Sequence, residues 1–233
     1  MSHWDWLTPL RRRGIRGALD VGANVGGWIP TWLDLGATRV VAVEPVPDQF
    51  EQLARNYWHD PRVECVRLGV SDVIERRDNL SVHGAWSLAP AIGRGSPTDH
   101  VMGRALEYVG KPPFSVEFDT IEAILSTRQF RPDFIKIDTD GYDAKAIGSA
   151  YGYLEEARPM IMLELSCLPH LLGDCCERMI QRLYRLGYRL QRITDGKAFA
   201  TSLDVMAEYP WRTSWDVLCW PRGEDPAPPT GYL

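Results

Sequence analysis

Residues 19–27 read Leu-Asp-Val-Gly-Ala-Asn-Val-Gly-Gly and decide how the rest of the chain is interpreted. They include the end of a short apolar segment, 18–21, which is typical of a buried strand, and they precede a helix expected at 28–35. Glycines at such a turn let a ligand approach the backbone closely, and the first turn of the helix offers free N–H groups. A glycine turn between a strand and a helix therefore predicts a nucleotide-type cofactor site.

Three residues around this turn distinguish between cofactors. Asn24 stands where a dinucleotide-binding loop has its second glycine, and Asp20 would repel a pyrophosphate but suits an ammonium group. Glu44 ends the next apolar strand, 39–43, where a carboxylate can accept hydrogen bonds from both ribose hydroxyls. S-adenosylmethionine carries an ammonium group, a sulfonium and a ribose but no phosphate. The turn therefore favours S-adenosylmethionine over NAD, and a turn that only packs a strand onto a helix is the non-functional alternative.

Strands and helices alternate along most of the remaining sequence. The helix beginning at Asp48 has an apolar face and, with Glu51, the spacing of a capping box. Asp143 is expected to cap a later helix in the same way. This alternation predicts an α/β fold with a mainly parallel sheet and helices on both faces. Further strands are expected at 63–68, 115–118, 134–137, 160–165, 188–193 and 215–220, and further helices at 120–127, 143–150 and 175–186.

The remaining segments define the expected domain organisation. Residues 1–16 are expected to form a solvated N-terminal arm, 17–220 one domain, and 221–233 a flexible tail rich in proline, glycine and charge. Residues 73–115 contain several glycines and prolines, and we expect one or two short strands and a long loop there. Long loops in compact domains are often lids, so 73–115 is the expected substrate lid or hairpin.

Composition excludes several classes of protein. The formal net charge is -5, so the chain lacks the basic field that nucleic-acid binders use, and we expect no nucleic-acid partner. The five cysteines are odd in number and form no Cys-x-x-Cys pair, which favours neither disulfides nor zinc and is typical of the reducing cytoplasm. No run approaches the ~20 apolar residues needed to span a bilayer. Oligomeric state is not predicted.

Several motifs, taken together and in this order, resemble the FkbM family of methyltransferases. The resemblance covers residues 17–193, and its most specific part is the block Phe-Ile-Lys-Ile-Asp-Thr-Asp-Gly-Tyr-Asp at 134–143. Two features depart from the family pattern: Asp140 and Asp143 replace glutamates, and Ser166 replaces a histidine. The other motifs are Asp-Val-Gly-Ala-Asn-Val-Gly at 20–26, Val-Glu-Pro at 43–45, Gly-Val-Ser-Asp at 69–72, Ser-Leu at 87–88, Phe-Asp-Thr-Ile at 118–121 and Met-Leu-Glu-Leu at 162–165.

The resemblance implies a Rossmann-like class I methyltransferase fold with seven strands, the last of them antiparallel. It also implies methyl transfer to a hydroxyl of a sugar, glycan or secondary metabolite. The turn would hold the methionine part of S-adenosylmethionine, Glu44 its ribose, and Ser71 or Asp72 would lie near adenine. Asp138 would border the sulfonium and the acceptor. The expected cofactor-binding residues are Asp20, Gly22, Ala23, Asn24, Gly26, Glu44, Ser71, Asp72 and Asp138.

Methyl transfer to a hydroxyl needs alignment of the acceptor and a base to remove its proton. Asp138 and Asp140 follow a central strand, at the edge where ligands bind in open α/β sheets. Each has an alternative role, Asp138 as a cofactor hydrogen-bond acceptor and Asp140 as a turn residue. Glu164 either faces the acceptor or pairs with Lys136, for which a structural ion pair is favoured.

Histidine is the other natural base near neutral pH, and His83 in the expected hairpin and His170 are candidates. A divalent metal on Asp138, Asp140 and Glu164 is chemically reasonable, because hard cations choose oxygen ligands, but it is not the favoured interpretation. Two other functions stay open: an NAD-dependent oxidoreductase, and a non-catalytic module that binds S-adenosylmethionine.

Overall fold

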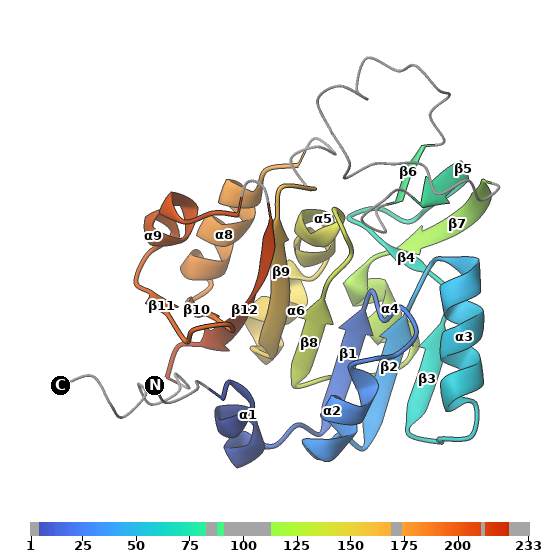
Figure 1. Cartoon of the computed structure of the whole chain (residues 1–233), viewed down its shortest axis with the longest axis horizontal. Helices are drawn as coiled ribbons and strands as arrows, with labels where there is room; N and C mark the ends of the chain where they lie inside the picture. The colour runs from blue at the N-terminus through green and yellow to red at the C-terminus, as the bar shows by residue number, and fades with distance from the viewer. Residues whose placement is uncertain (1–4, 83–87, 91–112, 169–173, 211–212, 224–233) are drawn as a thin grey trace.

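The computed structural model describes residues 5–82, 88–90, 113–168, 174–210 and 213–223, and its centre is an eight-stranded sheet (Figure 1). The strand order is β11-β10-β12-β9-β8-β1-β2-β3. The strands are β1 (Gly17–Val21), β2 (Arg39–Val43), β3 (Val63–Val66), β8 (Phe134–Ile137), β9 (Met160–Ser166), β10 (Tyr188–Arg192), β11 (Ala198–Phe199) and β12 (Ser214–Pro221).

The strand directions confirm the predicted class I methyltransferase topology. Strands β3, β2, β1, β8 and β9 pair in parallel, and β12 lies antiparallel between β9 and β10. Seven strands match the predicted ones in position. The additional β11 is a two-residue strand that pairs with the edge strand β10.

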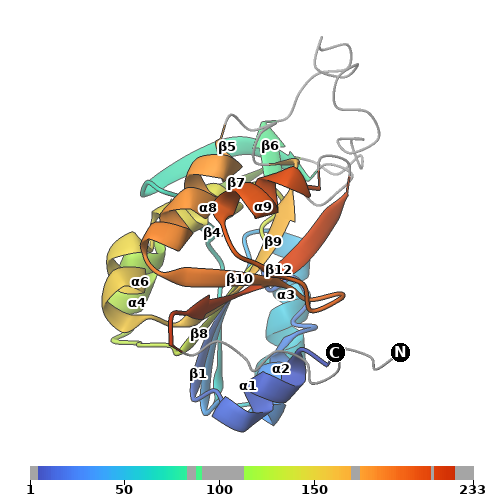
Figure 2. The ribbon, with the colours of Figure 1, turned by 90° about the vertical axis from the view of Figure 1, so that its left-hand side faces the viewer.

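Two groups of helices cover the two faces of this sheet (Figures 1 and 2). The first group is α1 (Leu7–Arg13), α2 (Ile29–Asp34) and α3 (Pro47–Tyr57); the second is α4 (Ile121–Thr127), α5 (Asp143–Gly148), α6 (Tyr151–Ala157), α8 (Cys176–Arg185) and α9 (Ser202–Ala207). Side chains alternate between the two faces along each strand, so that in β1 Ala18 packs toward the first group and Leu19 toward the second.

A second, four-stranded sheet lies beside the carboxyl ends of the central strands (Figure 1). Its order is β4-β7-β5-β6, formed by β4 (Gly69–Val70), β5 (Glu75–Val82), β6 (Leu88–Pro90) and β7 (Phe114–Asp119). The one or two short strands expected within 73–115 are present as β5 and β6, although β5, with eight residues, is longer than expected. Residues 83–87 and 91–112 of the expected lid lie outside the described residues.

Three further expectations differ from the structure. Part of the expected N-terminal arm forms α1, whose Leu10 is fully buried beneath the sheet. The expected capping box at Asp48 is absent, because α3 begins earlier, at Pro47, and its N-cap Val46 has no capping side chain. Helices α6 and α9 were not anticipated, since each is only six or seven residues long.

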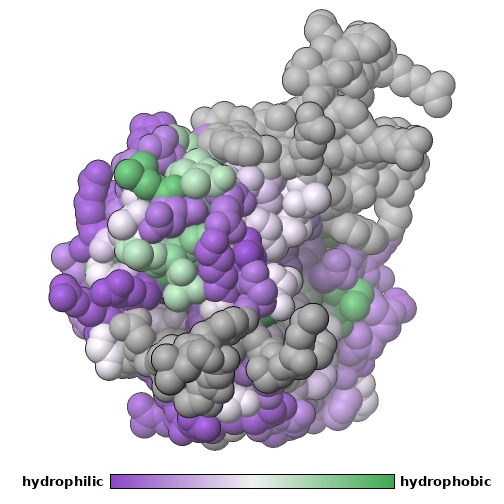
Figure 3. Space-filling model, turned by 60° about the vertical axis from the view of Figure 1, so that its left-hand side comes forward, coloured by the Kyte–Doolittle hydropathy of each residue, from purple (hydrophilic) through white to green (hydrophobic). Residues whose placement is uncertain are grey.

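The described helices offer no membrane span, since none of them is both long and apolar enough to cross a bilayer. Figure 3 shows one face of the molecule, on which hydrophilic side chains predominate and apolar side chains gather in small areas.

Candidate functional site

Strand register brings the carboxylates of three strands to one place. Asp20 of β1 lies opposite Lys136 of β8, and Lys136 lies opposite Met162 of β9. Because side chains alternate, the residues two positions further on, Asp138 and Glu164, follow on the same side of the sheet. Asp216 of β12 lies opposite Glu164 and extends the row.

A pocket lies between the glycine turn, the start of α3 and the second sheet. Its cavity volume is about 100 Å³, and the pocket opens to solvent. Its lining residues come from both sheets: Val21, Gly22, Asn24, Val43, Glu44, Pro45, Val46, Gln49, Leu68, Gly69, Val70, Phe118, Asp138, Thr139, Asp140 and Tyr142.

The glycine turn has the conformation that its glycines permit. Gly22 has a φ of 75°, and a Cβ there would lie 1.8 Å from the carbonyl oxygen of Asp138. Gly26 has a φ of 87°, and a Cβ there would lie 2.3 Å from the Tyr57 ring. Glycine at these positions therefore lets the turn pack directly on the loop after β8 and on α3.

Glu44 is held at the pocket by two backbone N–H groups. Asn24 N donates to its Oε2 at 2.8 Å, and Val46 N donates to its Oε1 at 2.9 Å. Burial raises the pKa of Glu44, and these hydrogen bonds oppose that effect. Each carboxylate oxygen still has a lone pair for a ligand hydroxyl. The geometry is compatible with the role expected for Glu44.

Asp20 does not line the pocket, which differs from its expected direct contact with the cofactor. Its side chain is fully buried on the α2 side of the sheet, where Trp32 Nε1 donates to Oδ2 at 3.0 Å. Lys136 Nζ lies 3.4 Å from Asp20 Oδ1 and 3.3 Å from Asp138 Oδ2. Asp20 lies on the same side of the sheet as Asp138 but further from the strand ends, where Lys136 is its charged partner.

Four other expected cofactor residues also lie outside the pocket lining. Ala23 is buried beneath the turn, and Gly26 packs against α3. Ser71 is buried and its Oγ donates to the exposed Asp72 at 3.1 Å. The backbone turns into the second sheet at β4, so the residues just before them, 68–70, line the pocket instead.

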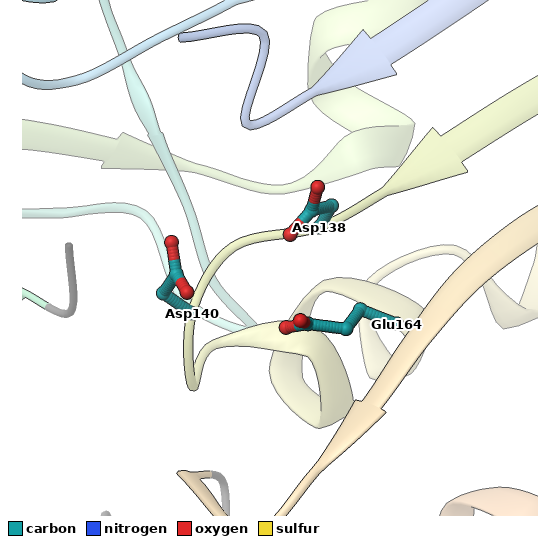
Figure 4. A group of neighbouring side chains, drawn as sticks. All are labelled: Asp138, Asp140 and Glu164. Carbon is teal, nitrogen blue, oxygen red and sulfur yellow. The ribbon is translucent and has the colours of Figure 1, made fainter. Parts of the chain in front are cut away.

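The carboxylates of Asp138, Asp140 and Glu164 lie close together (Figure 4), and the first two of these residues line the pocket. One carboxylate oxygen from each lies within 4.8 Å of the others. Burial, together with the charge of Asp138, raises the pKa of Asp140 and of Glu164 to about 8. Glu164 Oε2 is buried without a hydrogen-bond partner in the described part of the chain. Protons, a cationic ligand or a hard divalent cation could each relieve this repulsion.

Asp143 shapes the loop that carries two of these carboxylates. Its buried side chain accepts hydrogen bonds from Thr139 N and Oγ1, both at 2.9 Å, and from Gly141 N at 3.1 Å. The expectation that Asp143 caps the following helix is therefore wrong, because its carboxylate turns back to the preceding loop. The bonds hold Asp140 at a left-handed φ of 50°.

Lys136 forms the predicted ion pair, but with Asp20 and Asp138 rather than Glu164. Burial alone would lower its pKa, but the two carboxylates outweigh burial and raise the pKa. The predicted sites His83 and His170 lie outside the described residues.

Several residues that line the pocket were not among the predicted site residues, including Gln49, Phe118 and Tyr142. The rings of Phe118 and Tyr142 stack with centroids 5.2 Å apart, and Arg77 Nη1 donates to the Tyr142 hydroxyl at 3.1 Å. These contacts join the two sheets and depend on tertiary structure. Gln49 was detectable in principle, because it lies one turn before Leu53 on the apolar face of α3.

The fold and the strand-end pocket together define a Rossmann-like methyltransferase. The family model described as "Methyltransferase FkbM domain" matches residues 20–190, and the chain belongs to this family. A crystal structure of methyltransferase FkbM from Methylobacillus flagellatus KT superposes with a TM-score of 0.53 at 15% identity. That match covers 88% of this chain and 43% of the other, and it supports the fold.

Two curated relatives are tRNA U34 carboxymethyltransferases, from Shewanella frigidimarina and Shewanella loihica. Each is 30% identical over 112 residues, which are 43% of this chain and 32% of the relative. The match therefore spans about a third of the length of these relatives.

Proposed function

We propose that this protein is an S-adenosylmethionine-dependent methyltransferase that acts on a hydroxyl of a small molecule, sugar or glycan. The observation that carries the proposal is the pocket, in which Glu44 and the glycine turn meet the carboxylates that follow β8. Glu44 would bind the ribose hydroxyls. Gly22, Asn24 and Asp138 would surround the methionine part. The five free cysteines support a reducing, cytoplasmic setting.

In this proposal the protein aligns the acceptor hydroxyl with the methyl group and supplies a base. S-adenosylmethionine provides the activated methyl group when bound. Asp138 is engaged by Lys136, whereas Glu164 and Asp140 have pKa values raised to about 8. A carboxylate with a pKa in that range is a strong enough base to take the acceptor's proton as the new bond forms. We assign this task to Glu164, because its buried Oε2 has no hydrogen-bond partner among the described residues.

Asp20 and Lys136 would act indirectly. Lys136 Nζ donates to the carbonyl oxygen of Gly22 at 3.0 Å and also contacts both carboxylates. One buried ammonium thus joins the glycine turn to the loop after β8, which fixes the two walls of the cofactor pocket relative to each other.

A nucleic-acid acceptor is the second candidate, because the curated relatives are named for tRNA modification. The net charge of -5 disfavours it, since RNA binding relies on a basic surface. Incubation with labelled S-adenosylmethionine and either bulk tRNA or hydroxylated saccharides separates the two. Label in tRNA, with none in saccharides, would contradict the hydroxyl proposal.

Calorimetric titration tests the cofactor. We expect micromolar binding of S-adenosylmethionine and S-adenosylhomocysteine and no binding of NAD. Glu44→Ala is expected to weaken binding at least tenfold, since it removes the ribose acceptor. Glu51→Ala is the matched control, because Glu51 lies on α3 and is 65% exposed. Binding of NAD, or of neither sulfur ligand, would overturn the proposal.

A further inference from the structure

One polar side chain in the cofactor pocket has a buried carbonyl oxygen with no hydrogen-bond partner among the described residues. Gln49 lies in the first turn of α3, and only 7% of its surface is exposed. Its Oε1 atom is buried and accepts no hydrogen bond from any described residue. An unsatisfied buried carbonyl of this kind destabilises the fold, and a hydrogen-bond donor on a ligand can satisfy it. Gln49 also lines the pocket, so a ligand there can reach it.

The surroundings of Gln49 identify the part of the ligand that it faces. The pocket lining includes polar side chains such as Asn24 and Asp138 and apolar side chains such as Val46, Leu68 and Val70. A flat, mostly apolar ring can pack against the apolar side chains. Glu44 lies five residues before Gln49 and has two oxygens for the ribose hydroxyls. The base of the nucleoside is therefore the group left for Gln49.

This inference rests on the proposed cofactor: we propose that Gln49 recognises the adenine base by accepting a hydrogen bond from its 6-amino group. A carboxamide suits this task, since glutamine and asparagine side chains pair with the N6/N7 edge of adenine in other recognition systems. The carboxamide oxygen of Gln49 would be satisfied only when the cofactor is bound. Gln49 would then act as a specificity-determining residue for the nucleoside.

The test compares two ligands on two variants. The ligands are S-adenosylhomocysteine and its 6-deamino analogue, in which purine replaces adenine. Gln49→Leu keeps the side-chain volume approximately but removes the acceptor. Gln52→Leu is the control, because Gln52 lies on the exposed face of α3 and bonds only Asn56.

We expect wild type and Gln52→Leu to bind S-adenosylhomocysteine about tenfold more tightly than the analogue. Gln49→Leu is expected to bind the two ligands equally, at the weaker affinity. Its Tm without ligand is expected to equal or exceed that of the wild type, since an unsatisfied buried group is removed.

Two results would overturn the inference. Unchanged S-adenosylhomocysteine affinity in Gln49→Leu would show that Gln49 makes no contact with the ligand. An equal loss for both ligands would show that it does not read the amino group. Failure of the wild type to bind S-adenosylhomocysteine at all would instead remove the proposed cofactor, and the inference with it.

Discussion

At the scale of single residues, the pair Glu164 and Asp140 determines how the site responds to pH. Their carboxylates share one small space, and burial raises both pKa values to about 8. Groups this close titrate as a pair, so a rate profile reports apparent pKa values of the pair.

The first prediction concerns the base. If Glu164 removes the acceptor's proton, kcat rises with pH and levels off above about 8, because the carboxylate must be unprotonated. Glu164→Gln is expected to lower kcat by roughly 10²–10⁴ with little change in the KM for S-adenosylmethionine. The kcat and pH profile of Asp216→Asn, a variant on the neighbouring strand, provide the comparison. An unchanged pH profile in Glu164→Gln would assign the base elsewhere.

A second residue-scale prediction concerns the buried ammonium. Lys136 is 1% exposed and lies between Asp20 and Asp138. Lys136→Met leaves two carboxylates without their cation, and we expect a loss of roughly 3–5 kcal/mol in the free energy of unfolding. Urea denaturation measures this, with the half-exposed Lys197→Met as control. Adding Asp20→Asn is expected to restore part of the loss; strictly additive losses would contradict the ion-pair explanation.

At the scale of elements, α1 is the clearest departure from sequence expectation. Its Leu10 is buried, and the Trp6 ring contacts Trp28 with centroids 5.7 Å apart. Leu10→Ala is expected to cost roughly 2–5 kcal/mol of unfolding free energy, since it leaves a cavity. The exposed Arg12→Ala on the same helix is expected to change stability by less than about 0.5 kcal/mol. Equal effects in denaturant titrations would show that α1 does not contribute to the core.

Helices and strands with a clear periodic or continuous pattern of apolar residues were predictable from the sequence, and those defined by tertiary contacts were not. Strand β8 was predicted to the residue, because four consecutive apolar or charge-paired residues are buried between two strands. Strand β5 was missed in part, since its sequence Glu-Arg-Arg-Asp-Asn-Leu-Ser-Val has few apolar residues and a register shift between Arg77 and Leu80. Helix α1 was missed because residues 1–16 were expected to be a solvated arm, and the burial of Leu10 depends on tertiary contacts.

The residues of the candidate site were also predictable only where local sequence pattern determines their position. Strand ends can be located from sequence, so Glu44, Asp138 and Glu164 were placed at the correct edge of the sheet. Side-chain direction at those ends depends on strand register and on distant partners. Asp20 was therefore expected at the ligand, although Trp32 and Lys136 hold it beneath the turn. Gln49 was missed because its polar side chain does not by itself mark a pocket residue, although its spacing from Leu53 places it on the buried face of α3.

At the scale of the whole molecule, the buried carboxyls make stability depend on pH. Asp140 and Glu164 have folded-state pKa values of about 8, well above the ~4 of unfolded chains. The folded state therefore binds protons more tightly, and these groups reduce the free energy of unfolding as pH rises from about 4 to about 8.

Thermal unfolding provides the measurement. We expect Tm to fall by several degrees between pH 6 and pH 8.5, a window in which exposed carboxylates do not titrate. The double variant Asp140→Asn/Glu164→Gln is expected to be more stable than the wild type at pH 8.5 and to show a flatter dependence. The opposite trend, a wild-type Tm that rises toward pH 8.5 relative to the double variant, would contradict the pKa shifts.

The contact between Gly22 and the Asp138 carbonyl has a practical consequence for redesign. A Cβ at residue 22 would overlap this carbonyl oxygen, so position 22 must stay glycine, and a graft that moves the backbone after β8 would also disturb the glycine turn. Asp216 lies opposite Glu164 on the neighbouring strand, outside that contact. Acceptor preference is therefore best diversified at 216, where a library can sample new side chains while the glycine turn and the proposed base Glu164 are kept.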